Sequence, residues 1–514
     1  MMRTPSLKSG EAMALYRQLP GSHDPLDLYR KLGRGKPDTL LLEAAGGMAL
    51  IMPSAAVRIT CRAGEVTVMP VGEGGPNVLD ALKAKLAEFI SKDGGGELRF
   101  RFERSTSTDL EERLLAASPM DVLRALTRFP SLSPEEKFTL FCGGVVAFDH
   151  VDMFEDLPQP ASDPLYYPDF EFWLADALVI VEPNGKARLL SSFFGSDDSE
   201  RGTKAYHSAV SRLESLFAAC QAPVAAAAEK HADGHDVEPA ADLDDEQYAA
   251  LVTRVKENIA AGDVYQIVPS RTFRVPCADP LAAYARQRKS DPSPYMFFVA
   301  GSEHILFGAS PETSVKVWRE GGTPMVEVKP IAGTRRRGAT ADEDDRLEAD
   351  LRLDAKEGAE HIMLVDLARN DVARVSTPGS RRVARLLTVE RYARVMHLVS
   401  SVQGELAQGL DCLDALQACL NVGTLSGAPK LRATELLREY EATKRGPYGG
   451  AVGWLSGTGE MDTGVVIRSA LVKDGIAYVR AGAGVVHDSD PHAETEETRV
   501  KASAVLAALR GDEQ

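Results

Sequence analysis

The sequence contains no long hydrophobic segment. No uninterrupted apolar run approaches the roughly 18 residues that a membrane-spanning helix requires. The first 20 residues also lack the apolar centre of a secretory signal peptide. These two absences argue against a membrane protein and against a secreted one. We therefore expect a cytoplasmic protein with no membrane partner.

Cysteine is scarce, with six residues scattered at positions 61, 142, 220, 277, 412 and 419. None forms a C-x-x-C motif, which excludes a disulfide framework and indicates incidental thiols in a reducing compartment. An excess of basic residues is also missing, because 59 Lys and Arg face 75 Asp and Glu, a net charge of −16. This balance argues against a nucleic-acid partner. It also means that an anionic substrate requires a local cluster of cationic groups.

One segment of the chain has no apolar periodicity. Residues 221–245 are rich in Ala, Asp and Pro, which is typical of a linker. The segment divides an N-terminal part, residues 1–220, from a C-terminal part, residues 246–514. The overall content, 44% hydrophobic and 26% charged, is ordinary for a globular protein. We expect the two parts to pack together as one unit.

Strand-like and helical patterns alternate along both parts. In the N-terminal part, strands are predicted at 40–45, 57–61, 65–70, 143–148 and 177–183, and a helix over 77–91. In the C-terminal part, residues 246–263 form a predicted amphipathic helix. Residues 464–472 are predicted to form one strand with Arg468 in its middle. These patterns predict an α+β fold, with antiparallel sheets packed together and helices on the outside.

Two pairs of carboxylates have the same form. Glu357 and Glu360 lie in a helix predicted over 356–371, and Glu494 and Glu497 lie in a second predicted helix. Residues three apart share a helix face, so each helix presents two acidic groups in one direction. If the two faces meet, Mg²⁺ with oxygen ligands relieves the repulsion among four carboxylates. Taken alone, each pair is more typical of a solvated helix face.

Other features of the C-terminal part are suited to anion binding or proton transfer. The Thr/Ser/Gly loop that enters a helix over 424–435 offers N–H groups and hydroxyls to an anion. The small residues of 480–486 permit close approach of a ligand to the backbone. Arg468 binds a carboxylate through two hydrogen bonds if it faces inward, and otherwise lies on the solvent face of a sheet. His397 is either a core histidine or a group that transfers protons near neutral pH.

Ordered motifs in the C-terminal part resemble those of the chorismate-utilising enzymes, and among them the anthranilate synthase large subunits. The matching stretches run in the family's order from residue 262 to residue 502: GDVYQIVPSR, DPSPYMFF, GASPET, PIAGTRRRG, KEGAEHIMLVDLARND, GTLSGAPK, PYGGAVGW, VVIRSA, AGAGVV and EETRVKA. A weaker N-terminal match includes LLLEAAGG and GGVVAFDH. The resemblance implies the fold of the chorismate-utilising enzymes.

The resemblance also implies a reaction and a set of site residues. Ammonia adds to C2 of chorismate with loss of the C4 hydroxyl, and pyruvate then leaves to give anthranilate. Mg²⁺ is expected on the substrate carboxylate, held directly by Glu360 and Glu497 and through waters by Glu357 and Glu494. The implied substrate-binding residues are Thr334, Glu312, Tyr448, Arg468, Gly482, Ala483 and Gly484. The implied catalytic residues are His397, Gln266, Glu357, Thr424 and Lys501.

Two positions distinguish this chain among its relatives. Enzymes of the family that add water to chorismate carry a Lys base where this chain has Gln266, and Gln cannot deprotonate water. Aminodeoxychorismate synthases commonly carry a nucleophilic Lys in the motif PIKGT, where this chain has Ala332. Both residues favour the anthranilate synthase reaction. The alternatives are component I of an aminodeoxychorismate synthase and a non-catalytic regulatory subunit that binds tryptophan.

Partners follow from the resemblance as well. The sequence shows no Cys–His–Glu amidotransferase triad after the last motif, so a separate glutamine amidotransferase subunit is expected to supply ammonia within a hetero-oligomer. Members of the family are often inhibited by tryptophan. The corresponding pocket is expected at Glu43, Ala44, Asp291, Pro294, Tyr295 and Met296. Ala44 replaces the usual Ser and Asp291 the usual Asn, which removes one hydroxyl from that pocket.

Overall fold

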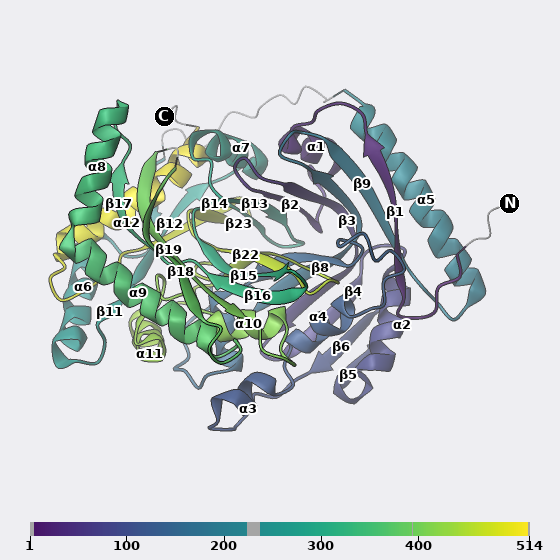
Figure 1. The fold of residues 1–514 in the computed structure, drawn as a ribbon, viewed down its shortest axis with the longest axis horizontal. Helices are drawn as coiled ribbons and strands as arrows, with labels where there is room; N and C mark the ends of the chain where they lie inside the picture. The colour runs from purple at the N-terminus through teal and green to yellow at the C-terminus, as the bar shows by residue number, and fades with distance from the viewer. Residues whose placement is uncertain (1–4, 224–236, 393, 512–514) are drawn as a thin grey trace.

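Antiparallel pairing organises the strands of this protein. In the computed structural model, which describes residues 5–223, 237–392 and 394–511, antiparallel neighbours join the strands into one continuous network. A separate short antiparallel pair consists of β11 (Gln266–Ile267) and β20 (Gly427–Ala428). Helices lie on the outside of the network (Figure 1). The predicted α+β class with outer helices is confirmed.

The N-terminal part of the chain supplies one end of this network. Its strands are β1 (Ala12–Leu19), β2 (Thr39–Glu43), β3 (Ala49–Arg62), β4 (Glu65–Pro70), β5 (Ile90–Gly94), β6 (Glu97–Arg101), β7 (Phe141–Val146), β8 (Phe170–Val181) and β9 (Ala187–Phe194). Its helices are α1 (Pro25–Leu32), α2 (Gly75–Lys85), α3 (Leu110–Leu115), α4 (Met120–Thr127) and α5 (Ser199–Gln221), with the 3₁₀ turns η1 (Ala87–Phe89) and η2 (Phe148–Met153). The long helix α5 covers β1 and β9 (Figure 1).

The C-terminal part supplies the remaining elements. Its other strands are β10 (Ala240–Ala241), β12 (Ser270–Pro276), β13 (Tyr295–Ala300), β14 (Ile305–Ser310), β15 (Thr313–Glu320), β16 (Thr323–Val328), β17 (Ile331–Arg336), β18 (Arg382–Arg391), β19 (Val395–Glu405), β21 (Ala451–Ser456), β22 (Met461–Val465), β23 (Ser469–Lys473) and β24 (Ile476–Gly482). Its helices are α6 (Asp245–Ala261), α7 (Pro280–Ser290), α8 (Ala341–Leu353), α9 (Ala355–Ala373), α10 (Cys412–Cys419), α11 (Lys430–Tyr440) and α12 (Pro491–Arg510).

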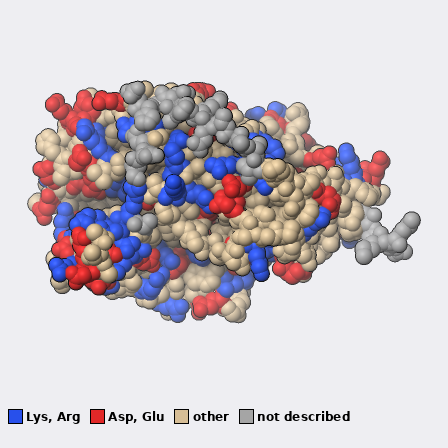
Figure 2. Space-filling model, turned by 90° about the horizontal axis from the view of Figure 1, so that it is seen from above, with Lys and Arg blue, Asp and Glu red and all other residues tan. Residues whose placement is uncertain are grey.

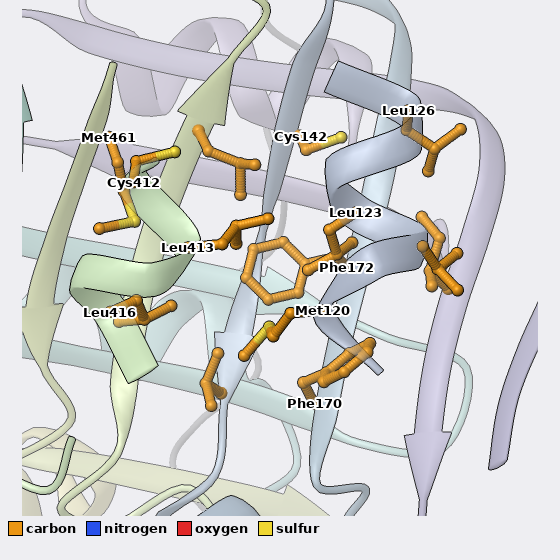
Figure 3. Close-up of a cluster of buried hydrophobic side chains, with 14 of the residues drawn as sticks. Met120, Leu123, Leu126, Cys142, Phe170, Phe172, Cys412, Leu413, Leu416 and Met461 are labelled. Carbon is orange, nitrogen blue, oxygen red and sulfur yellow. The ribbon is translucent and has the colours of Figure 1, made fainter. Parts of the chain in front are cut away.

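Strands and core residues join the two parts of the chain. β2 pairs with β13, so that Leu42 lies opposite Phe297, and β7 pairs with β21. One hydrophobic cluster combines Leu123 of α4 and Phe172 of β8 with Leu413 of α10 (Figure 3). Removing this shared apolar surface from water holds the two parts against each other. Of the linker predicted over 221–245, residues 224–236 lie outside the described residues, and Ala240–Ala241 form strand β10, which pairs with β12.

Capping residues fix where the two acidic helices begin. The Asp354 side chain accepts hydrogen bonds from two backbone N–H groups of the first turn of α9. Asp490 caps α12 in the same way, and Pro491 follows it at the first helical position. Gly511 ends α12 in the left-handed conformation, with φ of 78°. Each cap thereby places its Glu pair within the first two turns of the helix.

Two sequence predictions of local structure were wrong. The helix predicted over 77–91 ends at Lys85, because residues from Ile90 onward pair with β6 as strand β5, and this pairing outweighs the helical spacing of apolar residues. The strand predicted over 464–472 is broken at Arg468, which has a φ of 50° between β22 and β23. A side chain at such a position leaves the alternation of a strand, which decides where the Arg468 side chain points.

Charged side chains of both signs lie on the visible surface (Figure 2), and the cysteines are unpaired. Figure 2 shows Lys and Arg interspersed with Asp and Glu on one face, although the net charge is −16. Within the three described ranges, every helix is too short or too polar to traverse a bilayer. All six cysteines are buried as free thiols.

Candidate active site

A cavity of about 470 Å³ collects side chains from α9, α12 and the neighbouring strands. Of the residues predicted for catalysis, substrate binding or metal binding, those that line it are Gln266, Glu312, Thr334, Glu357, Glu360, His397, Thr424, Tyr448, Arg468, Gly482, Gly484, Glu494, Glu497 and Lys501. Residues more than 200 positions apart in the sequence therefore meet in one place. Ala483 does not line the cavity.

Three of the carboxyl groups that α9 and α12 contribute to this cavity have pKa values shifted in different directions. Burial raises the pKa of Glu360, and the negative charges of Glu357 and Glu497 raise it further. Burial also raises the pKa of Glu494, which lies beside Glu497. Burial opposes ionisation of Glu497 as well, but the Lys501 ammonium, 2.6 Å away, holds the pKa of that carboxyl below its usual range. The crowding of negative charge predicted from the sequence is present between the helices.

The acidic side chains of the cavity offer oxygen donors to a hard cation but do not form a closed metal-binding cage. Within the part of the chain that the structure describes, no three His, Cys, Asp or Glu side chains converge as a metal-binding group. Glu360 and Glu497 instead pair with Lys356 at 3.8 Å and Lys501 at 2.6 Å. The Glu494 Oε2 atom is buried and has no hydrogen-bond partner among the described residues. Mg²⁺ typically uses one or two carboxylates and completes its shell with water and substrate, so this oxygen-only arrangement suits it.

Two cationic side chains, Arg468 and Lys501, also line the cavity. The Arg468 guanidinium lies inside the protein, where burial lowers its pKa and the Asp291 carboxylate partly offsets that effect. Its Nη1 donates to the Lys501 carbonyl at 3.4 Å, and the Lys501 Nζ donates to the Gly482 carbonyl at 3.0 Å. Because both residues line the cavity, an anion bound there would meet two positive charges in one place.

The glycines at the end of β24 allow side chains to approach the backbone closely. A Cβ at Gly482 would lie 2.6 Å from the Pro269 carbonyl oxygen and 3.1 Å from the Tyr448 hydroxyl oxygen. A Cβ at Gly484 would lie 2.8 Å from the Gln266 Nε2 atom. Between them, the Ala483 amide is directed at the Pro269 carbonyl and the Tyr248 hydroxyl, both at 3.3 Å. That amide is therefore turned away from the cavity.

His397 is held in one tautomer. Its Nδ1 lies 2.9 Å from the Gly333 carbonyl oxygen and 3.1 Å from the Thr334 hydroxyl. Because a carbonyl only accepts, Nδ1 carries the proton and Nε2 carries the lone pair. Burial lowers the pKa of His397, and the nearby Arg468 and Lys501 charges lower it further. The imidazole is thus neutral at pH 7 and able to accept a proton.

Glu312 can donate a proton, whereas His397 can accept one. Its carboxyl accepts a hydrogen bond from the Thr424 hydroxyl at 2.7 Å. Burial raises the pKa of Glu312 to about 8, so it carries a proton at neutral pH. A protonated carboxylic acid and a neutral imidazole in one cavity provide an acid and a base at the same pH.

The two discriminating positions both face this cavity. Gln266 on β11 is buried, and its Oε1 atom has no hydrogen-bond partner among the described residues. Ala332 on β17 lines the same cavity with a methyl group. Neither side chain can take up a proton from water or attack a carbon atom.

Sequence reasoning missed an arginine at the edge of the cavity. Arg480 directly precedes the small-residue run 481–486, which is its only signal in the sequence. Its Nη2 donates to Glu441 at 2.9 Å, and Arg445 donates to the same carboxyl at 2.7 Å. Burial alone would raise the pKa of Glu441, yet the two arginines lower it to about 2. The Arg445 guanidinium then lies over the Tyr448 ring, 5.7 Å from its centre.

A second cavity of about 400 Å³ holds most residues of the predicted tryptophan pocket. Of these, Glu43, Ala44, Pro294, Tyr295 and Met296 line it. Asp291 does not line this cavity, and its charge acts on Arg468 instead. Pro311 and Ile331 line both cavities, so the two cavities share a wall.

The fold and the main cavity agree with the families that the sequence matches. The chorismate binding enzyme family matches residues 88–507, and the chain belongs to that family. It is 44% identical to anthranilate synthase component 1 of Vibrio cholerae serotype O1, over 98% of this chain and 97% of that protein. It is 42% identical to anthranilate synthase component 1 of Escherichia coli (strain K12), over 95% and 94%.

A solved structure agrees over most of its length. The crystal structure of anthranilate synthase component I from Streptococcus pneumoniae TIGR4 matches with a TM-score of 0.71 at 28% identity. The match covers 89% of this chain and 92% of that one. The resemblance seen in the sequence motifs therefore extends to the fold.

Proposed function

We propose that this chain catalyses the anthranilate synthase reaction in tryptophan biosynthesis: chorismate and ammonia give anthranilate, pyruvate and water. The observation that carries the proposal is the main cavity, which combines the acidic pairs with Arg468 and Lys501. Gln266 and Ala332 line the same cavity at the positions where related enzymes with other reactions carry a lysine base or a lysine nucleophile. Relatives named anthranilate synthase component 1 support it over the two alternatives.

Chorismate has two carboxylates, and the cavity offers a different partner to each. Arg468 and the Tyr448 hydroxyl are the groups for the enolpyruvyl carboxylate, because a guanidinium matches a carboxylate through two parallel hydrogen bonds. The ring carboxylate lies nearer the acidic helices in this scheme, where Lys501 and Thr424 help to hold it. Gly482 and Gly484 leave room for the substrate against the backbone.

The acidic pairs form the proposed Mg²⁺ site. Glu360 and Glu497 would hold the ion directly, and Glu357 and Glu494 through waters. The buried Glu494 oxygen without a partner and the mutual repulsion of the carboxylates support this arrangement. When bound there, Mg²⁺ would supply positive charge to the ring carboxylate as a Lewis acid.

Two side chains have the protonation states that the reaction requires. Glu312, protonated at neutral pH, donates a proton to the departing C4 hydroxyl as ammonia adds at C2. His397, neutral with its lone pair on Nε2, accepts a proton as the ring becomes aromatic and the enolpyruvyl group leaves. Ala332 cannot form a covalent bond to the ring, so ammonia adds directly.

A separate glutamine amidotransferase subunit is the proposed source of ammonia. The relatives' designation as component 1 supports a partner, and the two would form a hetero-oligomer. Feedback inhibition by tryptophan is proposed at the second cavity, where Glu43 would meet the ammonium group and the Met296 side chain the indole. The wall shared by the two cavities supports a route from one to the other.

Anthranilate fluorescence tests the proposal directly. The purified chain is mixed with chorismate, Mg²⁺ and ammonium chloride at about pH 8, with a second reaction that omits the ammonium salt. Ammonium-dependent fluorescence is the expected result. If fluorescence is absent and an added aminodeoxychorismate lyase releases p-aminobenzoate, the aminodeoxychorismate alternative is correct. If neither product forms while tryptophan binds, the non-catalytic alternative is correct.

A further inference from the structure

Helix α7 reaches the backbone of Arg468 through one buried side chain. The Gln287 Nε2 donates to the Arg468 carbonyl oxygen at 2.7 Å, and Gln287 has no solvent exposure. The Ala309 amide donates to the same oxygen at 3.2 Å. Arg468 is the residue with a φ of 50° that interrupts the strand between β22 and β23. Two donors therefore hold the carbonyl of a residue whose backbone conformation L-amino acids rarely adopt.

The orientation of the Gln287 amide follows from its partner. A carbonyl oxygen only accepts, so the amide must present its NH₂ group to Arg468. The other end, Oε1, is buried and lacks a hydrogen-bond partner within the described ranges. Burying an amide oxygen in this way is unfavourable, and an apolar residue would fill the same space without that cost. Among the described residues, the Gln287 side chain donates its hydrogen bond to Arg468.

The same face of α7 is anchored at the second cavity. The Tyr284 hydroxyl donates to one Glu43 carboxylate oxygen at 2.5 Å, and Arg288 donates to the other at 3.1 Å. Residues 284, 287, 288 and 291 are spaced by three or four, so they share one helix face. At the end of that face, Asp291 directs its charge toward the Arg468 guanidinium. One face of a single helix thus contacts both Glu43 and Arg468.

We propose that Gln287 is a positioning residue for Arg468: from a helix anchored on Glu43, it holds the Arg468 backbone in the conformation that aims the guanidinium into the chorismate cavity. This inference rests on the proposed function, because it takes the ligand of Arg468 to be a chorismate carboxylate. Neither the sequence motifs nor the similarity to known proteins points to Gln287.

Calorimetric titration of chorismate in the presence of Mg²⁺ tests the inference, alongside steady-state kinetics. Gln287→Leu removes the donor, and Gln287→Met removes it while keeping the length of the side chain. Both variants should weaken chorismate binding and raise KM about fivefold or more, with a smaller change in kcat, because the lost interaction orients a binding group. Leu213→Ala on α5, at a buried residue that lines neither cavity, is the control that lowers thermal stability without changing KM.

The outcomes separate the two levels of the proposal. If wild type binds chorismate and both Gln287 variants bind it within a factor of about two, the positioning role is wrong and the proposed function stands. If the variants lower the melting temperature and kcat but leave KM unchanged, as the α5 control should leave it, Gln287 is merely structural and the inference also fails. If wild type itself fails to bind chorismate, the proposed function fails, and the inference fails with it.

Discussion

The Thr424 hydroxyl donates a hydrogen bond to the Glu312 carboxyl at 2.7 Å. This bond joins the loop before α11 to the connection between β14 and β15. Burial raises the pKa of Glu312 to about 8, and Thr424 and Lys501 only partly counter that effect. The contact therefore places a protonated acid, rather than a carboxylate, against the substrate space at neutral pH. We expect its proton to affect both catalysis and stability.

Glu312→Gln should reduce kcat by about 100-fold or more, because the amide cannot donate an acidic proton. In wild type, activity should fall as pH rises through about 8, where Glu312 ionises. The pH profile of kcat/KM checks this expectation. An unchanged alkaline limb in the variant's residual activity would show that another group is the acid.

The same substitution should stabilise the protein at alkaline pH. Between the ordinary pKa of 4.5 and about 8, the folded chain keeps a proton that the unfolded chain loses. The folded state binds more protons in this window, so wild-type stability falls as pH rises through it. The melting temperature of Glu312→Gln relative to wild type should therefore increase from pH 5 to pH 8. A constant difference would mean that Glu312 is already ionised in the folded protein.

Glu360→Ala and Glu497→Ala should each abolish Mg²⁺-dependent turnover and leave the fold intact, because each removes a proposed direct ligand. Glu496→Ala is the matched control: this exposed carboxylate lies on the same helix and does not line the cavity. Activity is measured as a function of Mg²⁺ concentration, and circular dichroism reports the fold. Full activity at ordinary Mg²⁺ concentrations in either variant would show that the metal is bound by other residues.

Arg468→Lys should weaken chorismate binding strongly, because an ammonium is a point charge and cannot form two parallel hydrogen bonds to a carboxylate. Arg499→Lys, an exposed change on α12 at a residue that pairs with Asp245, should leave binding unchanged. Titration calorimetry with chorismate compares the two. Near-wild-type affinity in Arg468→Lys would contradict the clamp role.

Ala44→Ser should tighten tryptophan binding about threefold to tenfold, because it restores a hydroxyl to the wall of the second cavity. Glu43→Gln should weaken the same binding, since it removes the charge proposed to face the ammonium group. A thermal-shift titration with tryptophan measures both variants, and inhibition of anthranilate formation provides the second readout. Equal tryptophan affinity in all three proteins would place tryptophan outside this cavity.

Only part of the candidate site was predictable from local rules. Helical spacing placed Glu357 with Glu360, and Glu494 with Glu497, on common faces. The expected roles of Gln266 and Ala332 came from the resemblance of ordered motifs to those of a known family. Strand-like alternation was enough for the α+β class. These properties depend on residues close together in the chain, which is the range over which sequence patterns carry information.

Tertiary structure alone decided which of these residues act together and in what protonation state. The broken strand at Arg468, the single tautomer of His397 and the proton on Glu312 depend on burial or on groups as far apart in the chain as 64 residues for His397 and 181 for Arg468. Asp291, expected at the second cavity, faces Arg468 because the end of α7 lies there. By itself, the sequence determined the two acidic helices with their Glu pairs and the absence of a lysine at positions 266 and 332. Long-range packing, which no local pattern encodes, produces the backbone turn at Arg468, its hydrogen bond from Gln287 and the arrangement of the two cavities.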